Sequence, residues 1–224
     1  MKINFIKDIE VDIGNWQQSL SANSYGMDWS KMLPKDISLD QAKNIEYLRR
    51  YLEEKYYNSG KIDDFKNWLE TNSNQEQIKT DLEFLVGRSF PFEVVDVKIT
   101  SFWRAPYDAI NGSLFMIFRN SGRENSITNL YHEIMHFFFH RYYWEECKNS
   151  GLSEARIHDL KEACTVLLNP ILEKRELPLD KGYPAHQELR SKLVEIWQEE
   201  NNFDLFLKRV LGADLVSRVM SPKP

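Results

Sequence analysis

The stretch Tyr131-His132-Glu133-Ile134-Met135-His136 decides how the rest of the chain is interpreted. It places two imidazoles four residues apart, with a carboxylate directly after the first. On an α-helix, positions four apart lie on the same face, so both rings can reach one metal ion. Neutral imidazole is a good zinc ligand, and a carboxylate beside the metal can take a proton from water. The stretch predicts a helix that binds zinc through His132 and His136, with Glu133 as general base and acid.

The flanking sequence favours a helix here. Ser126 and Thr128 offer hydroxyl groups suited to an N-cap. Apolar residues then recur at spacings of three and four, without Gly or Pro as far as Trp144: Leu130, Ile134, Phe137 and Phe138. We expect this stripe to be buried and the histidines to face a cleft. The alternative is an amphipathic helix in which two histidines and one glutamate occur by chance.

A catalytic zinc site usually has three protein ligands, so a third is needed. His140 is the nearest histidine, but at 1.5 Å per residue it lies about 12 Å along the helix axis from His132. Zinc–nitrogen bonds of about 2 Å cannot span that distance on a straight helix. Phe137-Phe138-Phe139 occupies the interval in which metzincins place a turn-forming glycine. We therefore interpret His140 as a residue outside the ligand set.

The next predicted helix offers a carboxylate. Ser153 is suited to its N-cap, and Pro170 is expected to mark its end. Glu162 lies among small and mixed residues at helical spacing, and the interval from His136 allows the chain to turn and return antiparallel. Glu162 is the predicted third ligand. Glu154 is the alternative, although its place in the first turn favours an ordinary helix charge.

A His-Glu-x-x-His motif followed by a second helix with a glutamate resembles the gluzincin clan, the thermolysin-like zinc metallopeptidases. The Glu-Ala-x-Thr-x-x-x-Asn run that starts at Glu162 is most similar to its small, minigluzincin-type members. The resemblance covers residues 112–169. It implies that His132, His136 and Glu162 bind Zn²⁺ and that Glu133 is the general base and acid. It also implies that residues 113–118 form the edge strand along which a peptide or protein substrate lies.

The chain departs from the clan pattern in one place. Thermolysin-like enzymes often carry an aspartate four residues after the glutamate to support a ligand histidine, and Val166 stands there. Thr165 and Asn169 are candidates for that support. The clan also supplies a Tyr or His beyond the glutamate helix as a donor to the oxyanion. Tyr183 and His186 are candidates for this catalytic role. Taken alone, each is explained somewhat better as a loop tyrosine or a helix-start histidine.

The pattern of elements predicts an α+β fold in a single metallopeptidase-like domain, 1–224, with a small mixed or antiparallel sheet. Residues 1–90 are expected to form a strand plus helical cover, 91–170 the zinc-site core, and 171–224 C-terminal helices. Strands are predicted at 2–13, 92–103 and 113–119. Helices are predicted at 38–57, 63–70, 73–86, 186–200 and 203–211.

The charge, the apolar runs and the cysteine content of the chain limit the classes of partner and the cellular location that we expect. A net charge of −5 argues against the phosphate backbone of a nucleic acid. No apolar run is long enough to span a membrane, and the first residues lack the apolar core of a secretion signal. Two cysteines do not make a disulfide framework. We expect a cytoplasmic protein without membrane or nucleic-acid partners.

These observations predict a zinc-dependent peptidase. Three alternatives stay open: a zinc-binding scaffold with weak or no activity, a regulated protease of the kind that cleaves a transcriptional repressor, and a latent enzyme. In the last case the Pro-bearing tail, residues 221–224, would plug the cleft. The sequence leaves the oligomeric state open.

Overall fold

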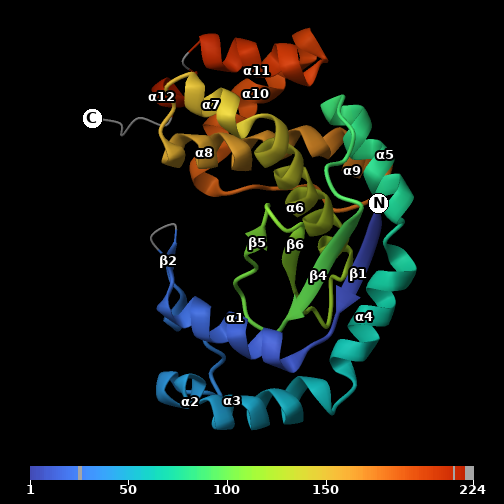
Figure 1. Ribbon diagram of the computed structural model, residues 1–224, viewed down its shortest axis with the longest axis vertical. Helices are drawn as coiled ribbons and strands as arrows, with labels where there is room; N and C mark the ends of the chain where they lie inside the picture. Colours follow the sequence, from blue (N-terminus) through green and yellow to red (C-terminus); the bar gives the residue numbers. More distant parts are fainter. Residues whose placement is uncertain (25–26, 214, 220–224) are drawn as a thin grey trace. The chain divides into compact units, whose positions relative to one another are not determined.

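The computed structural model describes residues 1–24, 27–213 and 215–219, and it has a mixed α+β fold (Figure 1). The chain divides into two compact units that interleave along the sequence. Residues 2–74 and 94–126 form one, called here the sheet unit; Met1, 75–93 and 127–224 form the other, called the helical unit.

The sheet unit contains a four-stranded sheet in the order β1-β4-β6-β5. Strands β1 (Lys2–Ile6), β4 (Val94–Thr100) and β6 (Ser113–Ile117) are parallel. The two-residue strand β5 (Tyr107–Asp108) runs antiparallel to β6, so the sheet is mixed. Alternate residues of β4, among them Val95 and Val97, are fully buried, so one face of this strand packs against the core.

The predicted edge strand at residues 113–118 is wrong in its first half. There β5 pairs with Ser113 and Leu114 and takes the outer position. The next amide, Phe115 N–H, donates to Pro106 O at 2.9 Å. A strand of two residues is too short to give a period-two pattern, which is why the sequence did not predict it.

The predicted strand at residues 2–13 is also partly wrong. Strand β1 ends at Ile6, and helix α1 (Ile9–Ser21) follows. The Asp8 carboxylate caps α1 by accepting hydrogen bonds from the backbone N–H groups of Glu10 and Val11. This local hydrogen bonding favours helix initiation over the alternating pattern.

Helices complete the sheet unit. The predicted capping box opens α2 (Leu39–Lys43), with both Ser38–Gln41 hydrogen bonds present. The helix predicted over 38–57 is broken at Asn44, whose side chain caps the next helix. The remaining elements are β2 (Asn23–Ser24), β3 (Met27–Asp28), η1 (Trp29–Met32), α3 (Ile45–Leu52), the π-helix η2 (Glu53–Tyr57) and α4 (Lys61–Asn72).

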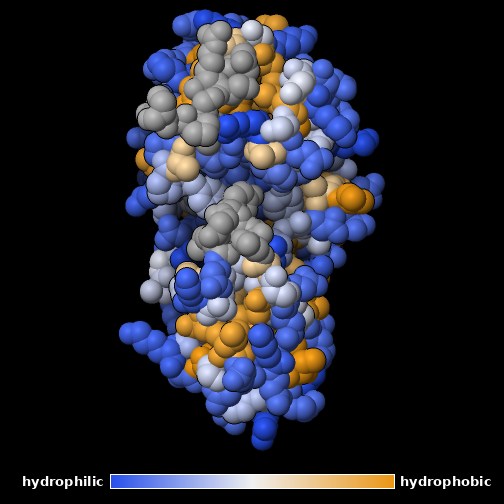
Figure 2. Space-filling model, turned by 90° about the vertical axis from the view of Figure 1, so that its left-hand side faces the viewer, coloured by the Kyte–Doolittle hydropathy of each residue, from blue (hydrophilic) through white to orange (hydrophobic). Residues whose placement is uncertain are grey.

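The core of the sheet unit centres on Trp16, which is fully buried and packs 4.8 Å from the Phe102 ring. Figure 2 views the molecule from the left-hand side of Figure 1. It shows apolar residues at the end of the sheet unit that carries α1, α2 and α3. Exposed apolar side chains of this unit include Met32, Ile45 and Trp103.

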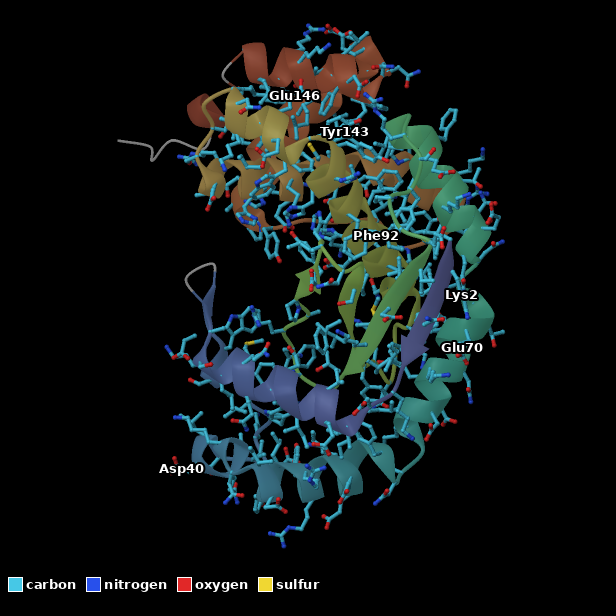
Figure 3. All side chains as sticks on the ribbon, in the orientation of Figure 1. Lys2, Asp40, Glu70, Phe92, Tyr143 and Glu146 are labelled. Atoms are coloured by element: carbon cyan, nitrogen blue, oxygen red, sulfur yellow. The ribbon has the colours of Figure 1, made fainter. Side chains whose placement is uncertain are left out.

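The helical unit takes in most of α6 (Glu124–Tyr142), whose first residues belong to the sheet unit. Its other elements are α5 (Gln75–Val86), α7 (Trp144–Asn149), α8 (Glu154–Cys164), η3 (Thr165–Leu168), α9 (Asn169–Lys174), η4 (Pro184–His186), α10 (Gln187–Glu200), α11 (Phe203–Gly212) and α12 (Leu215–Val219). Aromatic rings fill its core. The Phe92 ring packs 5.4 Å from that of Phe137. Tyr143 lies just after α6, and its ring packs 4.8 Å from that of Phe203. Figure 3 labels Phe92 and Tyr143.

Two predicted helix ends lie elsewhere. Because α6 begins at Glu124, Thr128 is inside it, and its hydroxyl donates to Pro178 O at 2.6 Å instead of capping. Helix α8 has its predicted N-cap at Ser153 but passes into the 3₁₀ turn at Thr165. Pro170 then occupies the first turn of α9, where its missing N–H costs no hydrogen bond.

None of the helices that the structure describes is both long enough and apolar enough to cross a membrane.

Candidate metal centre

Helix α6 presents the two motif histidines side by side. The rings of His132 and His136 have centroids 4.5 Å apart. The predicted apolar stripe is buried: Leu130, Ile134, Phe137 and Phe138 are each at most 1% exposed. Packing of this stripe fixes the rotation of α6 about its axis and therefore the direction of the imidazoles.

Helix α8 brings Glu162 to the two rings. Its Oε2 lies 3.3 Å from His132 Nε2, and its Oε1 lies 3.3 Å from His136 Nε2. Metal bonds of about 2.0–2.1 Å at tetrahedral angles separate neighbouring ligand atoms by about 3.3 Å. One ligand atom from each residue lies within 4.8 Å of the other two. The three residues therefore have the spacing needed to hold one metal ion.

The alternative third ligand is not part of this group. Glu154 is the first residue of α8, where it is exposed and contributes a negative charge to the first turn. Among the residues that the structure describes, the metal-binding group contains Glu162 and not Glu154.

Glu133 carries a buried oxygen with an unusual environment. Its Oε2 is inaccessible to solvent and has no hydrogen-bond partner among the described residues. Burial raises the pKa of Glu133 to about 7, against the attraction of neighbouring His132 and Lys161. A carboxyl group with a pKa near neutrality can both accept and return a proton.

Asp180 is the functional residue that sequence reasoning missed. Its Oδ2 lies 2.7 Å from His132 Nδ1. Burial would lower the pKa of His132, but the hydrogen bonds to Asp180 and Glu162 outweigh it and raise that pKa to about 10. Without a metal His132 is therefore protonated near pH 7, and a metal that binds Nε2 has to displace its proton. The carboxylate then keeps the remaining proton on Nδ1 and fixes the tautomer that presents Nε2.

A hydrogen-bond network holds Asp180 in place. Asn169 accepts from Asp180 N–H at 2.8 Å and donates to its carbonyl at 3.2 Å. Arg190 Nη2 donates to the same carbonyl at 2.6 Å, while its Nη1 donates to Thr165 Oγ1 at 2.9 Å. Gly182 N–H donates to Asp180 Oδ1 at 2.7 Å. Asn169 and Thr165, the predicted supports, therefore act through Asp180 and Arg190.

Lys161 introduces a positive charge beside the ligand set. Its side chain is buried, and Nζ donates to Glu162 Oε1 at 2.6 Å. Burial, with the charge of Lys161, lowers the pKa of His136 to about 3. His136 is consequently neutral near pH 7, the form in which imidazole binds metals.

Comparison with known proteins adds no relative. No protein-family model, no curated protein and no solved structure matches the chain. The site is therefore interpreted from its own geometry.

The remaining candidates lie outside the ligand group. His186 is buried, and its Nε2 lies 3.1 Å from Asp159 Oδ1. Tyr183 is half-exposed, with its ring 5.7 Å from that of His186. His140 stacks on Trp144 at 4.5 Å, in keeping with its exclusion from the ligands. In the described parts of the chain, none of these three joins the metal-binding group. The oxyanion role of Tyr183 and His186 stays a prediction.

Proposed function

We propose that this chain is a zinc-dependent peptidase. The observation that carries the proposal is the convergence, at metal-ligand spacing, of His132 and His136 of α6 with Glu162 of α8. Helix α6 also bears Glu133. Two imidazoles and one carboxylate suit Zn²⁺, and a set of three leaves a fourth position open, as catalytic zinc sites do.

In this proposal, residues of the chain transfer the proton from the attacking water to the leaving amine. Bound zinc supplies a Lewis acid that makes water nucleophilic near neutral pH. Glu133 Oε2 accepts the proton of the attacking water and returns it to the amine nitrogen that leaves. Asp180 holds His132 in the tautomer that presents Nε2.

The experiment is incubation of the zinc-loaded protein with a mixed peptide library, with cleavage followed by mass spectrometry. We expect wild-type protein to cleave peptides and Glu133→Gln to bind zinc normally while losing cleavage. Glu154→Gln removes an exposed carboxylate from the same unit and should cleave as wild type does. Cleavage by the Glu133→Gln variant would remove Glu133 from the mechanism, and no cleavage by zinc-loaded wild type would refute the peptidase.

Lys161 favours a second candidate, a zinc-binding scaffold without peptidase activity. Its ammonium donates to Glu162 Oε1, the oxygen that lies 3.3 Å from His136 Nε2. Two cations at one carboxylate repel each other strongly away from water. If Lys161 restrains the site, Lys161→Met binds zinc more tightly than wild type in a chelator competition. Unchanged affinity in a folded variant would remove this argument for a scaffold.

The proposed partner is a peptide or protein substrate. The peptide-binding role of residues 113–118, the cleavage of a repressor and the cytoplasmic location stay predictions. The tail expected to plug a latent site, residues 221–224, lies outside the described residues.

A further inference from the structure

The sheet unit has a hollow of about 360 Å³ that shares no residue with the metal-binding group. Its walls include residues that directly follow two parallel strands. Ser101 and Trp103 come after β4, and residues 118–121 come after β6. The hollow therefore lies at the carboxyl ends of β4 and β6. Its size is at the lower end of ligand pockets, about 300–1,000 Å³.

Aromatic rings supply the apolar walls. Tyr56 and Phe118 meet edge to face with centroids 5.6 Å apart, and Trp103 is 50% exposed. Tyr56 comes from the π-helix η2, a rare conformation that is found frequently at functional sites. A half-exposed tryptophan at a hollow offers a flat surface on which a planar ring can stack.

Arg119 supplies the charge. Its Nε is buried and has no hydrogen-bond partner within the described parts of the chain. No carboxylate of those parts lies within 4.0 Å of its guanidinium, and none of the described residues that line the hollow is acidic. A guanidinium binds carboxylate and phosphate through paired hydrogen bonds, and a buried N–H without an acceptor is unfavourable. Nε itself is closed to solvent, so an anion in the hollow would pair with the Nη groups of Arg119, for which no hydrogen bond or ion pair is found among the described residues.

We propose that this hollow binds a small planar organic anion, with its ring on Trp103 and a carboxylate or phosphate on Arg119. Asn120 and Ser121 line the same hollow and offer further hydrogen-bonding groups to the anion. Ser101 is committed elsewhere, because its hydroxyl donates to Asp12 Oδ2 at 2.7 Å. The inference is independent of the peptidase proposal, since it uses only residues of the sheet unit.

The test is calorimetric titration of the full chain with four probes. Indole-3-acetate and adenosine monophosphate each carry a planar ring and an anion, and the tighter of the two identifies carboxylate or phosphate as the partner of Arg119. Indole lacks the charge, and inorganic phosphate lacks the ring. We expect at least one ring-bearing anion to bind more tightly than indole and than inorganic phosphate, in zinc-free as in zinc-loaded protein.

Two arginine variants of equal charge locate the binding. Arg119→Gln should weaken binding about tenfold or more, the loss expected for a hydrogen bond to a charged group. Arg50→Gln, at an exposed position in the same unit, should leave affinity unchanged. Trp103→Ala should also weaken binding, and its affinity tests the proposal if Arg119→Gln fails to fold. Equal effects of the two arginine variants, no binding at millimolar concentrations, or indole binding as tightly as both ring-bearing anions would overturn the proposal.

Discussion

Replacing Asp180 by asparagine tests the residue on which the orientation of His132 depends. In the native site one carboxylate oxygen meets His132 Nδ1 at 2.7 Å, and the other accepts from Gly182 N–H at 2.7 Å. An asparagine has the same shape but only one accepting oxygen. Whichever way its amide faces, one of these two N–H groups then meets an NH₂ group. The variant also loses the negative charge beside the imidazole.

The expected effect is on metal affinity. Removing the carboxylate partner of a metal-binding histidine typically weakens metal binding about 10–100-fold, or about 1.4–2.7 kcal/mol. We expect a loss in this range for Asp180→Asn, measured by competition with a chromophoric zinc chelator at fixed pH. Far-UV circular dichroism should show that the variant is folded.

A second Asp–His pair in the same unit provides the matched control. Asp159 Oδ1 lies 3.1 Å from His186 Nε2, and neither residue belongs to the metal-binding group. Asp159→Asn makes the same chemical change and should leave zinc affinity unaltered. Equal zinc affinities in wild type and Asp180→Asn, with Asp180→Asn folded, would refute the proposed orienting role.

Three further predictions concern stability. Gly182 has φ +57°, and a Cβ there would lie 2.5 Å from Nη1 of buried Arg190, so Gly182→Ala should lower the free energy of unfolding by about 1–2 kcal/mol or more. Gly212→Ala should not lower it, because a Cβ there meets no atom within 4 Å, and equal urea midpoints for the two variants would contradict this. Burial raises the pKa of Asp12 to about 6 from 3.8, so its contribution to the free energy of unfolding is full below pH 3.8 and falls by up to about 3 kcal/mol as pH rises through 6. Urea unfolding across pH 4–7 should show this fall, and Asp12→Asn should remove most of the pH dependence. Zinc at 100 times its Kd should stabilise the protein by about 2.7 kcal/mol, and a chelator should reverse the rise in Tm; an unchanged Tm would mean that zinc does not bind the folded state.

The motif side chains could be predicted because their relation is local. Helical periodicity alone places His132 and His136 on one face, and the apolar stripe of α6 determines which face is buried. Glu162 could be proposed because a second amphipathic segment follows closely. Its approach to the two histidines depends on tertiary packing, which the structure supplies.

Asp180 could not be predicted on the same grounds. It lies in an irregular segment 48 residues after His132, where no periodic pattern indicates the direction of a side chain. The one local signal is the aspartate two residues before a glycine, which forms the turn at Gly182. Strand β5 and helix α1 were also not predicted from periodicity. Strand β5 is too short to give a pattern, and in α1 the Asp8 cap favours a helix although the sequence alternates.

Metal content is the most direct measure of whether side chains of α6 and α8 bind one common metal ion. The protein, loaded with zinc and passed through a desalting column, should retain one zinc ion per chain by elemental mass spectrometry. Glu162→Ala should lose that ion, whereas Glu154→Ala, the exposed glutamate of the same helix, should keep it. Wild type without zinc, or Glu162→Ala retaining it as firmly as wild type, would contradict the three-residue site.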